Sequence, residues 1–251
     1  MSEASADTPT TKKRTAIESV QEELKRRILN FELMPGDRLH VDNLRREFDV
    51  STATMREALS RLMTDTLVTS ERQRGFQVRE LSHEDFRNIS QARKIVETGA
   101  LRVSLANRDD DWEGDLFAAY HKLKLVEDRI FTQGDMTLAA EWHRRNSDFH
   151  DCLVRNCDNA WLTGFRHQLH EHSNRYLRLA LMKNLKQRDV RKEHAEIFDS
   201  AIKGDIDRCA ALIEQHIEAS VTDVARYLPQ TESEFASLRN LRPEQTAPVP
   251  E

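Results

Sequence analysis

Histidines recur on the apolar faces of three predicted helices in the second half of the chain. The first row holds Asn146 and His150, four residues apart, and the other two rows hold His194 and His216. Residues four apart on a helix share a face, so Asn146 and His150 can bind one ligand together. Burying several imidazoles without partners costs free energy, whereas a divalent cation bound by three imidazole nitrogens and one amide oxygen satisfies all of them. We therefore predict a metal site at these four residues, with zinc favoured over nickel or manganese.

Other histidines compete for this role. A lone histidine on an apolar face is more often a hydrogen-bonded core residue than a ligand, so the prediction depends on the convergence of three rows. His143 lies in the same row as His150 and is its main competitor. His167, His170 and His172 crowd one helix, and we interpret them as surface or lining positions rather than ligands.

An arginine also occupies an apolar row, in the helix predicted to begin at Ser82. Arg93 lies between apolar residues at helical spacing, where a guanidinium needs a carboxylate partner. One interpretation pairs it with Glu97, one turn further on. The interpretation that we favour is that Arg93 binds the carboxylate of a small anionic effector beside the metal. Arg175 and Tyr176 are further candidates for effector binding, and Arg178 is as plausible as either.

The elements before these helices form a different kind of unit. A capping box at Thr15 predicts a first amphipathic helix to about Phe31, Asp42 can cap a short second helix, and Ser51 caps a third. Two short helices joined by a tight turn are a helix-turn-helix. The residues after them alternate around a polar tip that ends at Gly75, which predicts a β-hairpin wing.

The third helix and the wing tip are the candidates for contacts with DNA. Arg56 lies opposite the apolar face formed by Met55, Leu59 and Leu62, and in a major groove it could reach a phosphate or a guanine edge. The alternative is a small helical domain whose arginines are merely solvated. The hairpin tip with two arginines and a glycine favours DNA binding.

The sequence of 16–79 resembles the winged helix-turn-helix of the GntR family of bacterial transcription regulators. The resemblance rests on the run ELKRRILNFELMPGDRLHVDNLRREFDVSTATMREALSRLMTDTLVTSERQRGFQV. It implies operator binding as a homodimer. By position, the implied DNA-contacting residues are Ser51, Thr52, Ala53, Arg56, Arg74 and Gly75. Thr52 and Ala53 stand where the family usually has Arg followed by Thr or Ala, so the operator sequence cannot be transferred from relatives.

The second half resembles the all-helical effector domain of the FadR-like class, and more closely its metal-binding, six-helix branch. The matching elements are Arg93 with Glu97 in the first helix and the runs NSDFH (146–150), EH (193–194) and QHI (215–217). The resemblance implies the metal ligands Asn146, His150, His194 and His216. Many relatives have Asp where this chain has Asn146. The lost negative charge should weaken metal binding and strengthen the attraction of the bound ion for an anion.

Composition limits the class of protein. Of 251 residues, 38% are hydrophobic and 32% charged, and no apolar run is long enough for a membrane span. The polar start lacks a secretory signal and the three cysteines form no disulfide or metal pattern, so we expect a cytoplasmic protein. Residues 1–80 carry no net charge, and the rest carry the whole −5. The expected fold is mainly α: a disordered arm (1–14), a winged helix-turn-helix (15–80), an antiparallel six-helix bundle (81–228) and a disordered tail (229–251).

These observations predict a homodimeric, ligand-responsive transcription regulator, in this family more often a repressor, here of a catabolic operon. Its expected partners are double-stranded operator DNA and a small carboxylate, and no membrane. The alternative is a metal-dependent hydrolase that uses the open position of a three-histidine site. No evident general base lies near the ligands, because Glu193 should point away from the row of His194. A hydrolase would also leave the winged helix-turn-helix without a function.

Overall fold

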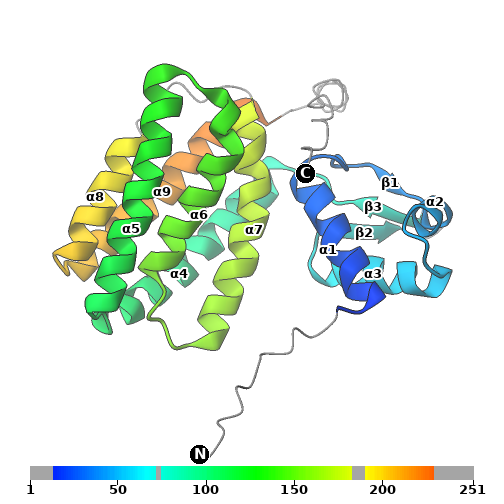
Figure 1. The fold of residues 1–251 in the computed structure, drawn as a ribbon, viewed down its shortest axis with the longest axis horizontal. Coiled ribbons are helices and arrows are strands. Elements are labelled where there is room, and N and C mark those ends of the chain that lie inside the picture. The colour runs from blue at the N-terminus through cyan, green and yellow to red at the C-terminus, as the bar shows by residue number, and fades with distance from the viewer. Residues whose placement is uncertain (1–13, 72–74, 183–189, 229–251) are drawn as a thin grey trace, which may run out of the picture. The chain divides into compact units, whose positions relative to one another are not determined.

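The computed structural model describes residues 14–71, 75–182 and 190–228 of the chain. The described residues divide between Glu80 and Leu81 into two compact units. Each unit has its own hydrophobic core. The described part of the first unit holds three helices and three strands, and that of the second holds six α-helices. Figure 1 labels these elements. The expected tail and all but the last residue of the expected arm lie outside the described residues.

The first unit combines three helices with a three-stranded antiparallel sheet in the order β1-β3-β2. Leu24 and Ile28 of one helix and Met55, Leu59 and Leu62 of another are fully buried in its core. The elements are α1 (Ala16–Leu29), β1 (Arg38–Leu39), α2 (Val41–Glu47), α3 (Thr52–Thr64), β2 (Val68–Glu71) and β3 (Gly75–Val78). The predicted winged helix-turn-helix is confirmed.

The capping box at the start of α1 is present in full. The Thr15 hydroxyl accepts a hydrogen bond from the Glu18 N–H at 3.2 Å, and the Glu18 carboxylate accepts one from the Thr15 N–H at 2.9 Å. The end of α1 differs from the expectation. The helix stops at Leu29, because Phe31 has a positive φ of 60°, which no α-helix continues. Phe31 is nevertheless buried.

In the next segment one local prediction was wrong and one element was missed. Asp42 does not cap α2: the N-cap is His40, without a side-chain cap, and Asp42 lies in the first turn, where its charge favours the helix dipole. The strand β1 was not expected at all. Its Arg38 and Leu39 pair with Gln77 and Phe76 of β3. A strand of two residues is too short to show an alternating pattern.

The wing is an antiparallel hairpin, as predicted. Val68 pairs with Val78, and Glu71 pairs with Gly75. Gly75 has φ +77°, a conformation that disfavours any side chain, so a glycine is required where β3 leaves the tip.

The described residues of the second unit form the six predicted α-helices. A π-helical turn, η1 (Asp128–Thr132), and a 3-10 turn, η2 (Met136–Leu138), separate the second and third of them. The helices are α4 (His83–Ala106), α5 (Asp110–Glu127), α6 (Ala139–Leu153), α7 (Ala160–Met182), α8 (Val190–Ile202) and α9 (Ile206–Tyr227).

Side-chain contacts show that neighbouring helices of this unit run antiparallel. Between α4 and α9, Lys94 pairs with Glu218 and Arg102 pairs with Asp207, so one helix ascends as the other descends. The same reversal relates α6 and α7, in which Asp151 contacts Arg166 and Ser147 contacts His170. Figure 1 shows the resulting bundle.

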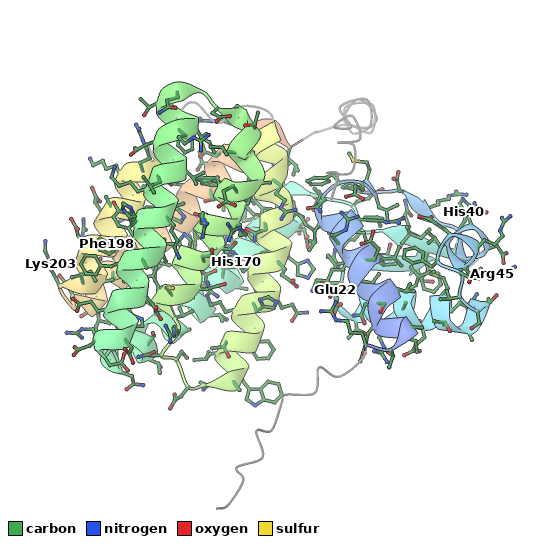
Figure 2. The ribbon with its side chains drawn as sticks, in the orientation of Figure 1. Glu22, His40, Arg45, His170, Phe198 and Lys203 are labelled. Carbon is green, nitrogen blue, oxygen red and sulfur yellow. The ribbon has the colours of Figure 1, made fainter. Side chains whose placement is uncertain are left out.

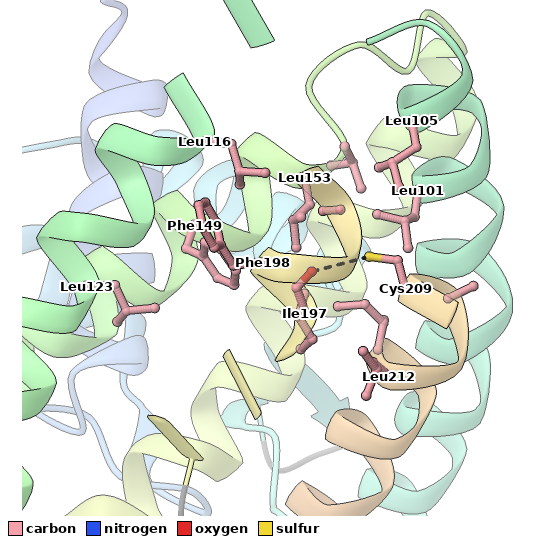
Figure 3. Close-up of a cluster of buried hydrophobic side chains, with 14 of the residues drawn as sticks. Leu101, Leu105, Leu116, Leu123, Phe149, Leu153, Ile197, Phe198, Cys209 and Leu212 are labelled. Atoms are coloured by element: carbon pink, nitrogen blue, oxygen red, sulfur yellow. Dashed lines mark hydrogen bonds between the residues drawn. The ribbon is translucent and has the colours of Figure 1, made fainter. Parts of the chain in front are cut away.

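The core of the bundle lies where these helices meet. Figure 3 shows its side chains, including Leu101, Leu116, Phe149 and Ile197 from α4, α5, α6 and α8. The thiol of Cys209 lies 3.8 Å from the Ile197 carbonyl oxygen and donates to it. Phe149 precedes His150 in the chain, so the packed core fixes α6, the helix that carries the predicted ligands Asn146 and His150. In the part of the chain that the structure describes, no helix is long and apolar enough to cross a membrane.

Candidate metal centre and nucleic-acid interface

The structure brings His150, His194 and His216 together from α6, α8 and α9. One ring nitrogen of each lies within 4.8 Å of the others, and all three residues are buried. The ring centroids are 5.5 Å apart for His150 and His194, 5.0 Å for His150 and His216, and 4.9 Å for His194 and His216. Three imidazoles at this spacing can share one cation.

Asn146 lies one turn before His150 on α6. It is only 5% exposed, and its Oδ1 has no hydrogen-bond partner among the described residues. A buried oxygen without a partner is rare in folded proteins. A cation beside the histidines would satisfy this oxygen, so the amide fits the predicted fourth ligand.

Carboxylates orient two of the imidazoles. Glu127 Oε1 lies 2.7 Å from His194 Nδ1, and Glu193 Oε2 lies 2.8 Å from His216 Nδ1. With Nδ1 engaged, Nε2 is the nitrogen left for a ligand, and His194 Nε2 is buried without a hydrogen-bond partner in the described chain. Carboxylate–histidine pairs of this kind fix the tautomer and raise the basicity of metal ligands. Glu193 was expected to point away from the row of His194, and its carboxylate lies against His216 of α9.

Sequence reasoning missed Glu127, although a signal was present. Glu127 ends the α5 row that holds Leu116 and Leu123, and it is 1% exposed. It also accepts a hydrogen bond from Trp142 Nε1 at 3.3 Å. A carboxylate in an apolar row needs a cationic or hydrogen-bond-donating partner. The position of Glu127 in such a row was therefore the signal, as it was for Arg93.

His150 has the electrostatic character of a neutral ligand. Burial lowers its pKa well below the usual 6.5, and the neighbouring His216 and His194 lower that pKa further. A neutral imidazole is the form that binds metal. Three imidazole nitrogens and an amide oxygen are a donor set that suits zinc and other divalent transition metals.

The competing histidine lies outside this group. His143 is buried next to Trp142, with ring centroids 5.3 Å apart. Burial lowers its pKa to about 3, and the positive charge of Arg178 acts in the same direction. The three-histidine group does not include His143.

Of the three histidines of α7, only His167 lies at the surface. His167 is exposed and lies 3.5 Å from Glu171. His170 and His172 are buried. Figure 2 shows His170 within the helical unit, where its Nε2 lies 3.2 Å from Ser147 Oγ of α6. Burial lowers the pKa of His170 to about 4.

Arg93 has partners inside the protein. Its Nε donates to Glu97 Oε1 and its Nη1 to Ser173 Oγ, both at 2.6 Å, and Arg93 and Glu97 are each 4% exposed. Burial alone would raise the pKa of Glu97, but the charges of Arg93 and Arg166 lower it. The internal pair with Glu97 is thus formed, and the burial of Arg93 does not require an external carboxylate.

Tyr176 has a structural role at the start of α4. Its hydroxyl donates to Asp85 Oδ2 at 2.7 Å and accepts from the Ser82 N–H at 3.4 Å. Its ring stacks on Phe86, with centroids 4.5 Å apart. Arg175, its neighbour, is buried. The hydroxyl of Tyr176 thus contacts the first turn of α4.

Arg166 was not singled out from the sequence. It is 5% exposed, and its Nη1 donates to Asp151 Oδ1 at 2.6 Å. Its Nε and Nη2 are buried and have no hydrogen-bond partner in the described residues. The inward row of α7 also contains His170 and Ser173, so a further polar residue did not stand out.

The predicted DNA-reading residues lie at the start of α3. Ser51 is the N-cap, and its hydroxyl accepts from the Thr54 N–H at 3.0 Å. Thr52, Ala53 and Arg56 are exposed. The guanidinium carbon of Arg56 lies 5.9 Å from the centroid of the Phe76 ring in β3, which links the helix to the wing. Gly75 is exposed at the start of β3, and Arg74 lies outside the described residues.

Comparison with known families identifies both units. Residues 16–78 match the family described as "Bacterial regulatory proteins, gntR family". Residues 88–219 match the FCD domain. The chain therefore belongs to the GntR family of bacterial regulators, in the FadR-like class that carries an FCD domain.

Individual relatives agree with this assignment. The chain is 36% identical over 214 residues to the "Uncharacterized HTH-type transcriptional regulator BphR" of Paraburkholderia xenovorans, covering 85% of this chain and 87% of that protein. It is 27% identical to the "HTH-type transcriptional repressor GlaR" of Escherichia coli, covering 77% and 89%. The solved structure of E. coli McbR/YncC has the same fold, with a TM-score of 0.68 and 19% identity, covering 85% of this chain and 99% of that one. The chain is a transcriptional regulator, so the comparisons do not support the hydrolase alternative.

Proposed function

We propose that this regulator is a homodimeric repressor that releases its operator when a small carboxylate binds at a metal centre in the FCD domain. The observation that carries the proposal is the convergence of His150, His194 and His216, two of them held by buried or half-buried carboxylates. One turn before His150 on α6, the buried Oδ1 of Asn146 has no hydrogen-bond partner among the described residues. Hydrophobic packing alone does not account for several buried polar side chains at one place, because burying them without partners costs free energy.

The proposed DNA contacts come from the start of α3 and the wing. The exposed Thr52, Ala53 and Arg56 follow the Ser51 cap, so the positive end of the α3 dipole and free backbone N–H groups face the same side as these side chains. Arg56 is the side chain that can donate two hydrogen bonds to a guanine edge. Arg74 and Gly75 belong to the wing that would follow an adjacent groove.

The proposed metal ligands are Asn146, His150, His194 and His216, and zinc is the ion that the donor set favours. The bound ion would supply a positive charge and an open coordination position. A carboxylate is the small-molecule group that suits both. Because Asn146 is neutral where an aspartate would be charged, less of the ion's charge is cancelled by its own ligands, which favours an anionic effector.

Dimerisation and repression complete the proposal. The first 80 residues carry equal numbers of acidic and basic side chains, so one reader has little nonspecific affinity and needs two linked half-sites. Repression is supported by the relative named as a repressor. The effector would favour one arrangement of the helical domains and thereby change the spacing of the paired readers. A chromosomal operator places the protein in the cytoplasm.

The test is a DNA-release assay on a duplex selected in vitro by the protein itself. We expect millimolar succinate, acetate or citrate to release zinc-loaded protein from this duplex, and to have at least tenfold less effect on chelator-treated protein. Release that is equal with and without metal would contradict the metal-centred effector site. Failure to select any duplex would contradict the DNA-reading assignment.

A further inference from the structure

The guanidinium of Arg166 has one satisfied edge and one orphaned edge. Nη1 donates to Asp151 on the outer side, where the Asp151 side chain is 57% exposed. Nε and Nη2, which form the opposite edge, are buried and have no partner in the described parts of the chain. These two N–H groups are parallel donors, and their spacing matches the two oxygens of a carboxylate. A buried donor without an acceptor costs free energy. Two such donors on one side chain therefore indicate that a ligand accepts hydrogen bonds from them.

The orphaned edge belongs to the neighbourhood of the three histidines. Asp151, the partner of Nη1, follows His150 directly in the chain. Ser147, which follows Asn146 directly in the chain, lies 3.2 Å through its Oγ from Nε2 of His170, one turn from Arg166 on α7. A second orphaned atom lies in this region: His170 Nδ1, on the same helix and one turn from Arg166, has no partner among the described residues, and His170 is 6% exposed.

Arg93 does not share these properties. It donates to Glu97 and Ser173, and the carboxylate of Glu97 is buried with it. An anion bound at Arg93 would have to compete with a buried negative charge at 2.6 Å. Arg166 donates to the half-exposed Asp151 through a different nitrogen. The charge of Arg166 also helps to lower the pKa of Glu97, but among the described residues no hydrogen bond engages Nε or Nη2, so this inner edge is available.

We propose that Arg166, and not Arg93, is the anchor for the carboxylate of the effector, with its Nε and Nη2 binding the two oxygens and His170 lining the same subsite. This inference rests on the proposed function, because it places the effector beside the metal centre. It limits the ligand to an anion that presents two oxygens side by side, since an uncharged group does not match two parallel charged donors as well.

The test compares succinate binding by calorimetry in the zinc-loaded wild-type chain and in three variants. Arg166→Gln should bind succinate at least tenfold more weakly, because charge-assisted hydrogen bonds are lost, while its zinc content stays equal to that of the wild type. Arg166→Lys should show a similar loss, because lysine keeps the charge but not the parallel donors. Arg144→Gln, which removes an exposed arginine of α6, should bind as the wild type does.

A second measurement does not depend on the ligand. Arg166→Met should raise the melting temperature of the ligand-free protein by a few degrees, because it removes two unsatisfied buried donors and strands only a half-exposed Asp151. A structural arginine would give a lower melting temperature instead, and that result would overturn the proposal.

The calorimetric outcomes separate this inference from the proposed function. Equal succinate affinity in the wild type and Arg166→Gln overturns the anchor alone. A wild-type chain that binds none of succinate, acetate and citrate contradicts the carboxylate effector itself, and the anchor with it. If Arg166→Gln fails to fold, Arg166→Lys and the melting measurement decide.

Discussion

Buried charges of two kinds lie side by side in the helical unit. Arg93 and Glu97 neutralise each other at 2.6 Å, and both are about 95% shielded from solvent. Arg166 is equally buried, but two of its three guanidinium nitrogens have no hydrogen-bond partner among the described residues. The charges of the first pair compensate each other, whereas the unsatisfied donors of Arg166 cost free energy in the absence of a ligand.

The Arg93–Glu97 pair gives a prediction about stability. Arg93→Met leaves the Glu97 carboxylate buried without its cation, and we expect the free energy of unfolding to fall by about 3–5 kcal/mol. The double variant Arg93→Met, Glu97→Met removes both charges and should recover most of this loss. Urea unfolding of the three proteins measures the difference. A single variant as stable as the wild type would show that the pair is not a closed structural unit.

Stability should also depend on pH through buried histidines. The pKa of His143 is lowered from 6.5 to about 3 by burial, so below pH 6.5 the unfolded chain binds a proton that the folded chain does not. The stability that His143 contributes is therefore present above pH 6.5 and is lost as the pH falls toward 3. Between pH 7 and pH 5 the loss is about 2 kcal/mol for this residue. Urea unfolding at both pH values should show a smaller difference for His143→Phe, and an unchanged difference would contradict the assignment.

At this scale the sequence predicted the cluster of three histidines better than the carboxylates that contact them. Helical spacing placed His150, His194 and His216 on inward rows, because each row is otherwise apolar. Spacing within one helix cannot show which residues of other helices face a ligand, so the contact of Glu127 with His194 was not predictable in detail. Arg166 was missed because its row on α7 is polar throughout, and an orphaned edge is visible only when all neighbours are placed.

At the scale of elements, α3 and the wing form one surface. Arg56 is exposed, while Met55, Ala58 and Leu59 beside it are fully buried. Its contact with Phe76 couples the helix to β3. The side chain is thus positioned by two elements without being part of their core.

Arg56→Ala should separate DNA binding from folding. We expect an unchanged melting temperature within about 1 °C and a loss of specific affinity of tenfold or more, since one base or phosphate contact of an arginine contributes about 1–3 kcal/mol. Fluorescence anisotropy on the selected duplex at physiological salt measures the affinity. Arg102→Ala, which changes an exposed arginine of the helical unit, is the control. Equal affinity of Arg56→Ala and the wild type would refute the recognition-helix assignment.

The elements themselves were largely predictable, and their ends were not. Apolar residues recur at helical spacing over long stretches, so six helices of the second unit and three of the first could be located. The end of α1 at Leu29 depends on the positive φ of Phe31, a conformation that packing imposes on a residue that rarely adopts it. The strand β1 exists only because β3 offers it backbone partners.

At the scale of the whole molecule, the proposed function requires a dimer. A neutral reader binds one half-site weakly, and linking two readers raises the effective concentration at the second half-site. Sedimentation velocity at micromolar concentration should therefore show a species of about twice the chain mass of 29.2 kDa. Deletion of residues 1–80 should leave the dimer intact if the helical domain holds it together. A monomeric full-length chain would contradict the proposal.

Metal binding should couple the helices of the FCD domain to one another, because its ligands come from α6, α8 and α9. An ion that binds only the folded bundle raises its stability by mass action. We expect zinc to raise the melting temperature of the wild-type chain, and to have no such effect on His150→Ala. Asn146→Asp should bind the ion more tightly, because it adds a negative ligand.

The most direct test of the account is the metal content of the purified chain, measured by elemental mass spectrometry after dialysis against zinc and then against metal-free buffer. The account predicts close to one divalent ion per wild-type chain and per His143→Ala chain, and less than about a fifth of that in His150→Ala. Full metal content in His150→Ala, with loss in His143→Ala, would place the site elsewhere in the α6 row and contradict the assignment of Asn146, His150, His194 and His216.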